Sequence, residues 1–394
     1  MFVLMGLIPY SRQSINDEDI SLITQTMSSD FLTQGPKIPE FEKALEQYFG
    51  VQHAIVCSSG TAALHLAYAS AGINHESLGI VPAITFAATA NALRYQSANI
   101  LICDVEPDTG LISIESLDHC LSGVSEEQKE KINLIAPVSF AGAVAPLDQC
   151  KKLAEHHNFI LIEDASHSPG ASTSSEQEGT IFSANGEHTL ASTLSFHPVK
   201  HICAGEGGAV LTNNPELAAI AARLRSHGIH RPFNENDEMP WFYEQESLGW
   251  NYRLTDLQAT LGISQLKRLD LFISKRRHLA KRYDLLLQAP PFSEHIQRPP
   301  FEEGHAWHLY VIRFMDKEKR NLAYKFLKSK NIFTQVHYIP VYKHPYYKNL
   351  LGQFNLPGAE AFFQSCLSIP IFPDLHESEQ DRVLEALELF LTKG

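Results

Sequence analysis

The stretch TLSFHPVKHICAGEGGAVLT, residues 193–212, places one lysine between two strand-like apolar runs. Lys200 follows the first run, and a glycine cluster around Glu206 precedes the second. Glycine is favoured where backbone must bend sharply or approach another group closely. A lone lysine beside apolar residues usually extends to the surface. A partly desolvated lysine instead has a lowered pKa and can form a Schiff base with a carbonyl. The neighbours of Lys200 in the fold decide between these two readings.

Helix-like and strand-like segments alternate along the chain from about residue 37. Such alternation predicts an α/β layer fold. The strand-like segments are continuous apolar runs, which are typical of parallel strands covered on both faces. The segments that carry this expectation are helices over 38–50 and 60–72 and strands over 53–59, 100–105, 132–140 and 159–165.

The pattern changes after a long helical stretch over residues 254–287. A strand-like run over 308–314, a further helix and an amphipathic C-terminal helix then predict a smaller α+β region. With 394 residues, of which 44% are hydrophobic, the chain is long enough for two domains. We therefore expect a large α/β domain over 1–264 and a small domain over 265–394, onto which the N-terminal segment could pack.

Charge and cysteine content restrict the function. The formal net charge of −13 argues against a nucleic-acid partner, because surfaces that bind a phosphate backbone are basic, but one small phosphate could still bind to backbone N–H groups. No CxxC pair occurs among the six cysteines, which predicts a reducing compartment without a zinc site or a disulfide framework. The opening MFVLMGLIPY lacks a secretory pattern, and no run is long enough to span a bilayer. We expect a cytoplasmic protein with no membrane partner.

Two further features fall at the ends of predicted strands, where open α/β sheets usually bind ligands. In CSSGTAAL, residues 57–64, a strand runs through Ser-Ser-Gly-Thr into a helix, which could hold a phosphate. An ordinary capped helix start has the same pattern. In LIEDASHSPGA, Asp164 follows an apolar strand and could pair with a cationic ring nitrogen, with His167 close behind. Asp164 could equally cap the next turn.

Each feature is weak alone, but their combination is specific. A phosphate cradle, an acid for a pyridinium nitrogen and an amine that captures an aldehyde follow one another along the chain. These are the groups that pyridoxal phosphate requires as an electron sink.

Several long motifs occur in an order that resembles the DegT/DnrJ/StrS family of nucleotide-sugar aminotransferases. They are SSGTAAL, PAITFAATANA, EDASHS, SFHPVKHICAGEGGAV and LGWNYRLTDLQATLG. The resemblance extends from IPYSRQSI near the start to VHYIPVY near residue 342. It implies an aspartate-aminotransferase-like fold (fold type I of pyridoxal phosphate enzymes), with a mixed seven-stranded sheet in the large domain. It also implies a homodimer with active sites at the interface.

The amino-acid sequence is most similar to the branch of the family that acts in pseudaminic acid biosynthesis. The motifs IPYSRQSINDEDI, PWFYEQESLGWNYRLTD and QVHYIPVYKHPYY carry this similarity. The resemblance implies amino transfer from L-glutamate to the C4 keto group of a UDP-linked 4-keto-6-deoxy-N-acetylhexosamine. Amination at C3 or C4 of another UDP- or dTDP-linked keto sugar is the alternative within the family.

The resemblance also assigns roles at the ring of the cofactor. Lys200 would hold pyridoxal phosphate covalently and later move the proton, and Asp164 would pair with the ring nitrogen. His167, the third residue of the catalytic group, would bond near the ring oxygen. Phe86, in PAITFAA, would stack on the ring.

At the phosphate, the resemblance assigns Gly60, Thr61 and Ser195. Asn251 would reach the same phosphate from the other subunit. The weaker candidates for the sugar pocket are Tyr10, His337 and Tyr338.

Three positions depart from the pattern of the branch. Ser139 and Ala143 stand where a histidine and a glutamine or glutamate are usual, and Ala204 stands where a threonine usually begins the glycine turn. None of them replaces the lysine, the aspartate or the phosphate residues. They bear on the identity of the sugar rather than on the chemistry.

Three other functions remain as alternatives. A sugar dehydratase of the same fold would carry histidine in place of Lys200. A non-catalytic, cofactor-binding regulatory protein would usually have an additional DNA-binding domain. The 19 histidines suggest a metalloenzyme as the third alternative. Against it, no HExxH motif occurs, and His156 and His157 lie at a polar helix end, where they are expected to be solvated.

Overall fold

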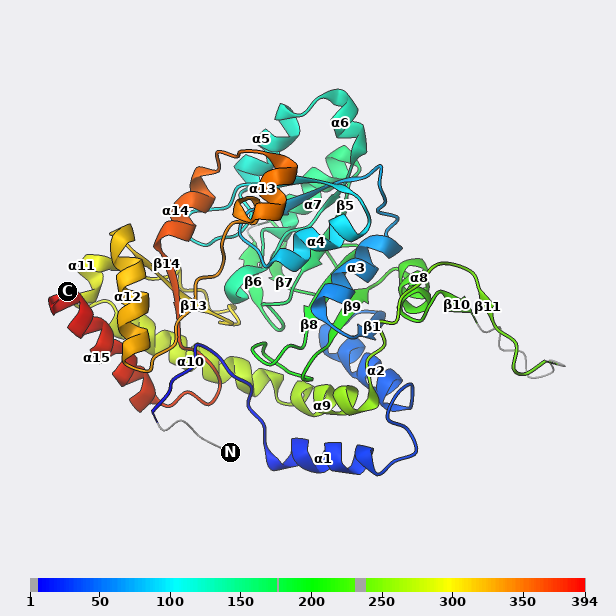
Figure 1. The fold of residues 1–394 in the computed structure, drawn as a ribbon, viewed down its shortest axis with the longest axis horizontal. Coiled ribbons are helices and arrows are strands. Elements are labelled where there is room, and N and C mark those ends of the chain that lie inside the picture. Colours follow the sequence, from blue (N-terminus) through cyan, green and yellow to red (C-terminus); the bar gives the residue numbers. More distant parts are fainter. Residues whose placement is uncertain (1–5, 176, 231–238, 394) are drawn as a thin grey trace.

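A seven-stranded mixed sheet forms the centre of the protein (Figure 1). The structure, a computed structural model, describes residues 6–175, 177–230 and 239–393; the first five residues of MFVLMGLIPY lie outside these ranges. Only β9 runs against the other strands, so six carboxyl ends lie at one edge of the sheet. The order is β1 (His53–Cys57), β9 (Gly208–Thr212), β8 (Ala191–Ser195), β5 (Ile160–Asp164), β4 (Ile132–Ile135), β2 (Leu78–Pro82) and β3 (Asn99–Cys103). The expected mixed seven-stranded sheet is confirmed.

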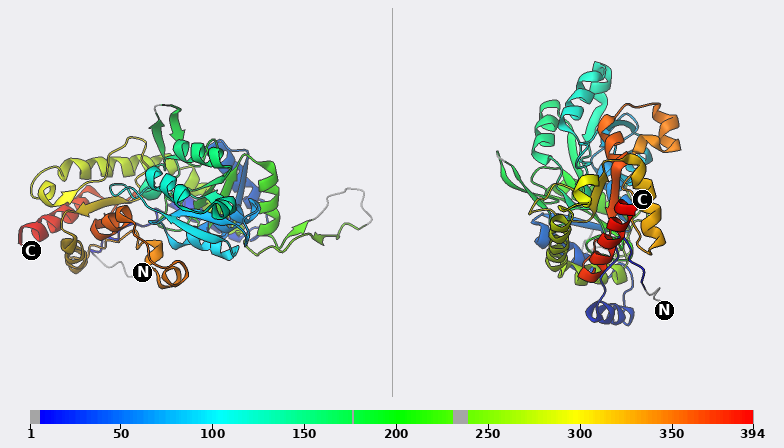
Figure 2. Two further views of the ribbon diagram at one scale, coloured as in Figure 1. Left: turned by 90° about the horizontal axis from the view of Figure 1, so that it is seen from above. Right: turned by 90° about the vertical axis from the view of Figure 1, so that its left-hand side faces the viewer.

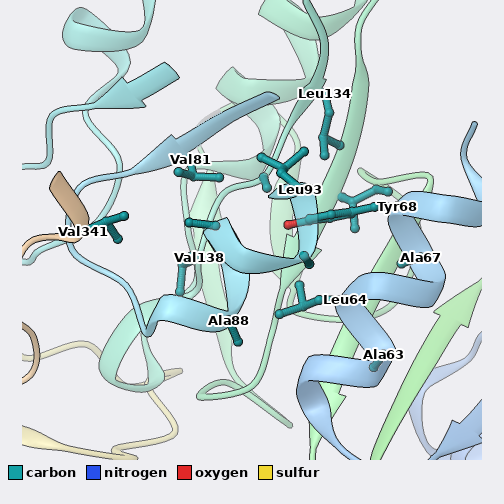
Figure 3. Packing of buried hydrophobic residues seen from close by; sticks show 14 of the residues in the cluster. Ala63, Leu64, Ala67, Tyr68, Val81, Ala88, Leu93, Leu134, Val138 and Val341 are labelled. Carbon is teal, nitrogen blue, oxygen red and sulfur yellow. The ribbon is translucent and has the colours of Figure 1, made fainter. Parts of the chain in front are cut away.

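Helices cover both faces of this sheet. Along β1, Ile55 and Cys57 belong to one buried cluster, and Ala54 and Val56 to another, as the alternation of a strand requires. The first cluster includes side chains of α3, α4 and α8, and Figure 3 shows part of it, with Tyr68 close to Leu93 and Leu134. The second includes α2 and α9, while α5 and α7 pack on the same sheet farther along. These helices are α2 (Lys37–Phe49), α3 (Gly60–Ser70), α4 (Ala87–Tyr95), α5 (Ile114–Gly123), α7 (Leu147–His157), α8 (Pro215–Arg225) and α9 (Asp256–Leu266); the short polar helix α6 (Glu126–Lys131) connects α5 to β4.

The long helical stretch expected over 254–287 is two helices. α9 ends at Leu266, and α10 (Leu269–Leu286) begins three residues later. At the break, Arg268 pairs with the buried carboxylate of Asp19 on α1 (Asp17–Met27). The break lets α9 pack on α1 and α2, while α10 leads into the C-terminal part of the chain (Figure 1).

The C-terminal part has its own three-stranded antiparallel sheet and hydrophobic core. The sheet consists of β12 (Ile296–Gln297), β13 (Tyr310–Phe314) and β14 (Cys366–Ile369). The N-terminal segment packs here, because the buried Ile8 exchanges backbone hydrogen bonds with Asn331 and Phe333. A domain boundary between residues 264 and 265 stays a prediction. The helices of this part are α11 (Phe292–His295), α12 (Lys317–Ser329), α13 (Pro345–Leu351), α14 (Pro357–Ser365) and α15 (Glu377–Lys393).

Two short strand pairs extend from the body of the protein. β6 (Ser172–Ser175) pairs with β7 (Gly179–Phe182), and β10 (Ile229–His230) pairs with β11 (Glu244–Gln245) (Figure 2). Among the described residues, no helix has the length and apolar character needed to cross a membrane. Over the same ranges, no three His, Cys, Asp or Glu side chains are grouped so that they could hold a metal ion.

Candidate active site

Lys200 lies in the loop that joins β8 to β9. The two strands are antiparallel, with Ser195 opposite Gly208 at the mouth of the loop. Within the loop, Phe196 donates its N–H to Gly207 O at 2.8 Å, and Ala204 donates to Phe196 O at 2.8 Å. Ala204 is buried and thus fills the loop rather than facing solvent. This tight loop holds Lys200 at the edge where the parallel strands end.

Burial changes the chemistry of the Lys200 amine. It lowers the pKa of Lys200 to about 8, although the Asp164 carboxylate acts in the opposite direction. A lysine with an ordinary pKa is almost wholly protonated at neutral pH and is a poor nucleophile. Lys200 has a larger unprotonated fraction, as capture of an aldehyde requires.

The start of α3 is held directly against this loop. Ser59 caps the helix, with its Oγ accepting the N–H of Ala62 at 3.1 Å. A methyl group at Gly60 would lie 2.8 Å from the Ser195 Cβ, and one at Gly208 would lie 2.4 Å from the Ser59 oxygen. The helix start can therefore approach the loop only because both positions are glycine. Backbone N–H groups at this helix N-terminus, with the half-buried Thr61 beside them, form a cradle that suits a phosphate.

Asp164 lies at the carboxyl end of β5, beside Thr193 of β8. Its side chain is 5% exposed. Thr89 on α4 donates its hydroxyl to Asp164 Oδ2 at 2.7 Å, and the Ser166 N–H donates to Oδ1 at 3.1 Å. No sequence pattern indicated a role for Thr89, although it lies within the PAITFAATANA motif, three residues after Phe86. Phe86 precedes α4, and its ring is 59% exposed.

His167 is buried and hydrogen-bonded at both ring nitrogens. Its Nδ1 accepts the N–H of Ala141 at 3.3 Å, and its Nε2 lies 3.2 Å from the Tyr338 hydroxyl. Burial, together with the nearby Lys200 charge, lowers the pKa of His167 well below its ordinary value. The ring is therefore neutral near pH 7.

Tyr10, His337 and Tyr338 come to the same region from distant parts of the chain. The rings of Tyr10 and His337 are 5.4 Å apart, and those of Phe86 and Tyr338 are 5.9 Å apart. Burial lowers the pKa of His337 to about 3, and its Nδ1 lies 2.8 Å from Ser368 Oγ. Next to Tyr10, Ser11 donates its hydroxyl to Val199 O at 3.2 Å, which brings the N-terminal segment against the lysine loop.

Asn251 is not joined to this group by any contact among the described residues. Its side chain is exposed, while the carbonyl of Tyr252 accepts the Ser58 N–H at 2.8 Å. Asn251 therefore lies one residue from the segment that borders the α3 cradle of its own chain. Its role at the phosphate of a second copy stays a prediction.

Ser139 is part of a buried network around Glu163, next to Asp164 on β5. Glu163 is 1% exposed, and Ser139 donates to its Oε1 at 2.5 Å. Two more hydroxyls and one N–H complete the shell of Glu163, from Ser183, Ser192 and Ala184. Ser139, one of the positions that depart from the pattern of the branch, is thus hydrogen-bonded to the buried Glu163 carboxylate. Ala143 closes the short helix η1 (Phe140–Gly142) by donating to Phe140 O at 2.9 Å.

Comparison with known proteins identifies the family. The family described as the DegT/DnrJ/EryC1/StrS aminotransferase family matches residues 13–388. The chain belongs to this family. It is 37% identical, over 390 residues and 98% of both chains, to the UDP-4-amino-4,6-dideoxy-N-acetyl-beta-L-altrosamine transaminase of Campylobacter jejuni subsp. jejuni.

Solved structures of other aminotransferases have the same fold. PseC of Helicobacter pylori, an aminotransferase involved in the biosynthesis of pseudaminic acid, superimposes with a TM-score of 0.86 at 30% identity, over 98% of this chain and 99% of that one. A putative sugar aminotransferase of Streptococcus pneumoniae in its PMP-form gives 0.88 at 26% identity, over 98% and 99% of the two chains. The expected aspartate-aminotransferase-like fold is confirmed, and the protein is a pyridoxal phosphate-dependent sugar aminotransferase.

The residues at the sheet edge fit this cofactor. Gly60 lets the N-terminus of α3 lie close to Ser195, where its backbone N–H groups can bind the phosphate. The buried Asp164 provides an acid for the ring nitrogen. The Lys200 amine, with its lowered pKa, lies close enough to Asp164 for their charges to interact. The structure thus brings together the three features that the sequence presents far apart.

Proposed function

We propose that the protein transfers an amino group from L-glutamate to the C4 keto group of a UDP-linked 4-keto-6-deoxy-N-acetylhexosamine. The product would be the 4-amino sugar nucleotide of pseudaminic acid biosynthesis. The full-length similarity to a transaminase of that substrate class supports the choice of sugar. The observation that carries the chemistry is the meeting of Asp164, Lys200 and the α3 cradle at one edge of the sheet.

Pyridoxal phosphate supplies an electron sink at the reacting carbon when it is bound. Lys200 would hold it covalently, and its Nζ would remove and return the proton at the carbon that exchanges the amino group. Asp164 would bind the ring nitrogen, and Phe86 would lie against one face of the ring. His167 would lie near the ring oxygen.

The phosphate would be bound by Gly60, Thr61 and Ser195. Asn251 of a second copy would complete this site in a homodimer. Support for a homodimer comes from exposed apolar side chains near that residue, among them Leu248 at 84% and Trp241 at 71%. The sugar would lie against Tyr10, His337 and Tyr338.

We also propose a cytoplasmic location. All six cysteines are free thiols, and five of them are buried. Free buried thiols are usual in proteins of a reducing compartment.

The test is a transfer assay with defined substrates. The cofactor-loaded protein is incubated with L-glutamate and the UDP-linked 4-keto-6-deoxy-N-acetylhexosamine, and 2-oxoglutarate and the amino sugar are measured. Proton NMR of the product identifies the aminated carbon. Parallel reactions use L-glutamine or L-aspartate as donor and a dTDP-linked 4-keto-6-deoxyhexose as acceptor.

We expect 2-oxoglutarate and C4 amine in equal amounts, and neither with Lys200→Ala. Preference for the dTDP sugar or for amination at C3 would contradict the proposed substrate while leaving the aminotransferase chemistry intact. Preference for another amino donor would contradict the role of L-glutamate.

A further inference from the structure

Tyr338 has a hydroxyl whose proton is not used within the protein. Its Oη contacts His167 Nε2 at 3.2 Å, and no other partner of this hydroxyl occurs among the described residues. The direction of this hydrogen bond follows from the other side of the imidazole. The N–H of Ala141 can only donate, so His167 Nδ1 must accept it.

A neutral imidazole carries one proton, which must therefore be on Nε2 of His167. The opposite tautomer would bring the Nδ1 proton against the N–H of Ala141. His167 consequently donates to the Tyr338 oxygen, and the Tyr338 O–H must point to an acceptor elsewhere. Burial raises the pKa of Tyr338 well above its ordinary value, so this proton stays in place near pH 7.

The backbone that fixes His167 is itself held firmly. Ala141 has a φ of 58°, a left-handed conformation that few residues other than glycine adopt. Its carbonyl accepts the Leu309 N–H at 3.0 Å, and the carbonyl of Gly142 accepts the Ala306 N–H at 2.8 Å. The same short helix packs the Phe140 ring 6.1 Å from the Tyr338 ring. One turn therefore fixes both partners of the hydrogen bond.

Tyr338 also lies beside residues that are proposed to hold the cofactor ring. The Asp164 charge raises the pKa of this phenol, and the exposed Phe86 ring lies 5.9 Å from its ring. We propose that Tyr338 donates a hydrogen bond to an oxygen of the bound ligand, and that His167 is the positioning residue that aims this donor. With Nδ1 occupied and Nε2 donating, His167 is not a general acid or base. The acceptor is either the ring oxygen of the cofactor or an oxygen of the sugar.

The test compares Tyr338→Phe with the unchanged protein, because this substitution removes the hydroxyl alone. The first readout is the pH at which the visible absorbance of the cofactor-loaded protein changes. A donor to the ring oxygen stabilises the deprotonated form, so its loss should raise this apparent pKa by about one pH unit or more. The second readout is the calorimetric Kd of UDP-N-acetylglucosamine, which should rise about tenfold if the acceptor is on the sugar. If neither the absorbance pKa nor the calorimetric Kd changes, the proposal is overturned.

Substitutions of His167 test its positioning role. His167→Phe should cause most of the same shift, and the double variant with Tyr338→Phe should add little to it. His167→Gln, whose amide can still donate to Tyr338, should restore most of the unchanged behaviour. If His167→Phe still causes its full effect in the Tyr338→Phe background, then His167 contacts the ligand directly. That outcome would overturn the positioning role.

The matched control is Tyr342→Phe. Tyr342 also has a raised pKa, but its hydroxyl donates to Glu360 at 2.6 Å. We expect neither readout to change, and an equal shift in this control would overturn the assignment to Tyr338. The sugar arm rests on the proposed function, whereas the absorbance arm requires only bound cofactor. A protein that binds cofactor but transfers no amino group to the sugar would refute the proposed function and still test Tyr338.

Discussion

At the scale of single residues, the Lys200 amine is prepared by two opposing influences. Burial lowers its pKa to about 8, and the Asp164 charge moderates that effect. Only the unprotonated amine attacks an aldehyde, so the rate at which the apoprotein captures pyridoxal phosphate should rise with pH, with a midpoint near 8. Stopped-flow absorbance measures this rate.

Asp164→Asn removes the charge that raises the pKa of Lys200, so the midpoint should move to lower pH. A midpoint near the ordinary lysine value in the unchanged protein would contradict a desolvated amine. Lys200→Arg, which keeps a cation without the nucleophile, should show no covalent capture at any pH.

The residues of the site differ in how far the sequence predicts them. Lys200, Asp164 and Ser195 follow strand-like runs, and such positions meet at one edge of a parallel sheet. Thr89 and Ala141 carry no such signal. Thr89, in the first turn of α4, reaches the Asp164 carboxylate at the end of β5, and Ala141 contributes only a backbone N–H, which any residue possesses. These contacts depend on three-dimensional packing that local patterns do not encode.

At the scale of elements, the approach of α3 to the β8–β9 loop depends on Gly208. A methyl group there would lie 2.4 Å from the Ser59 oxygen, so Gly208→Ala must displace the helix start. Such overpacking costs about 1–3 kcal/mol, and we expect the Kd of pyridoxal phosphate to rise by about tenfold. Fluorescence titration of the apoprotein measures it. Gly123→Ala, at a position with open space around it, is the control that should leave the Kd unchanged.

The helix α10 contributes a buried arginine that joins three segments. Arg276 is fully buried, and its Nη1 donates to the carbonyls of Trp307, His308 and Ile371 at 3.0–3.1 Å. Arg276→Met replaces the arginine with an apolar side chain of similar length and leaves these carbonyl acceptors without their donor. We expect the free energy of unfolding to fall by about 2–4 kcal/mol in urea titrations.

The control for Arg276 is Lys281→Met, an exposed position on the same helix, which should change stability little. Equal stability of the two variants would mean that water or neighbouring groups replace the guanidinium.

At the scale of the whole molecule, the resemblance to the family implied the mixed sheet, while the order of apolar runs along the chain predicted only an α/β layer fold with parallel strands covered on both faces. It did not predict the break between α9 and α10, where the decisive contact is between Arg268 and Asp19. Nor did it predict that Ile8 pairs with Asn331 and Phe333, although packing of the N-terminal segment on the small domain was an expectation. Such contacts join residues hundreds of positions apart, and one sequence carries no local signal for them.

The exposed apolar surface next to the site gives the largest-scale prediction. Leu248 is 84% exposed and lies three residues before Asn251, the residue proposed to reach the phosphate of a second copy. If a second copy covers Leu248, then Leu248→Asp places a charge in the interface, which is costly to bury. This variant should sediment as a monomer and lose cofactor faster on dialysis. Leu285→Asp, on the 66%-exposed Leu285 of α10, should remain dimeric with its cofactor bound. A Leu248→Asp dimer with normal cofactor retention would place the interface elsewhere and leave each phosphate site to be completed within one chain.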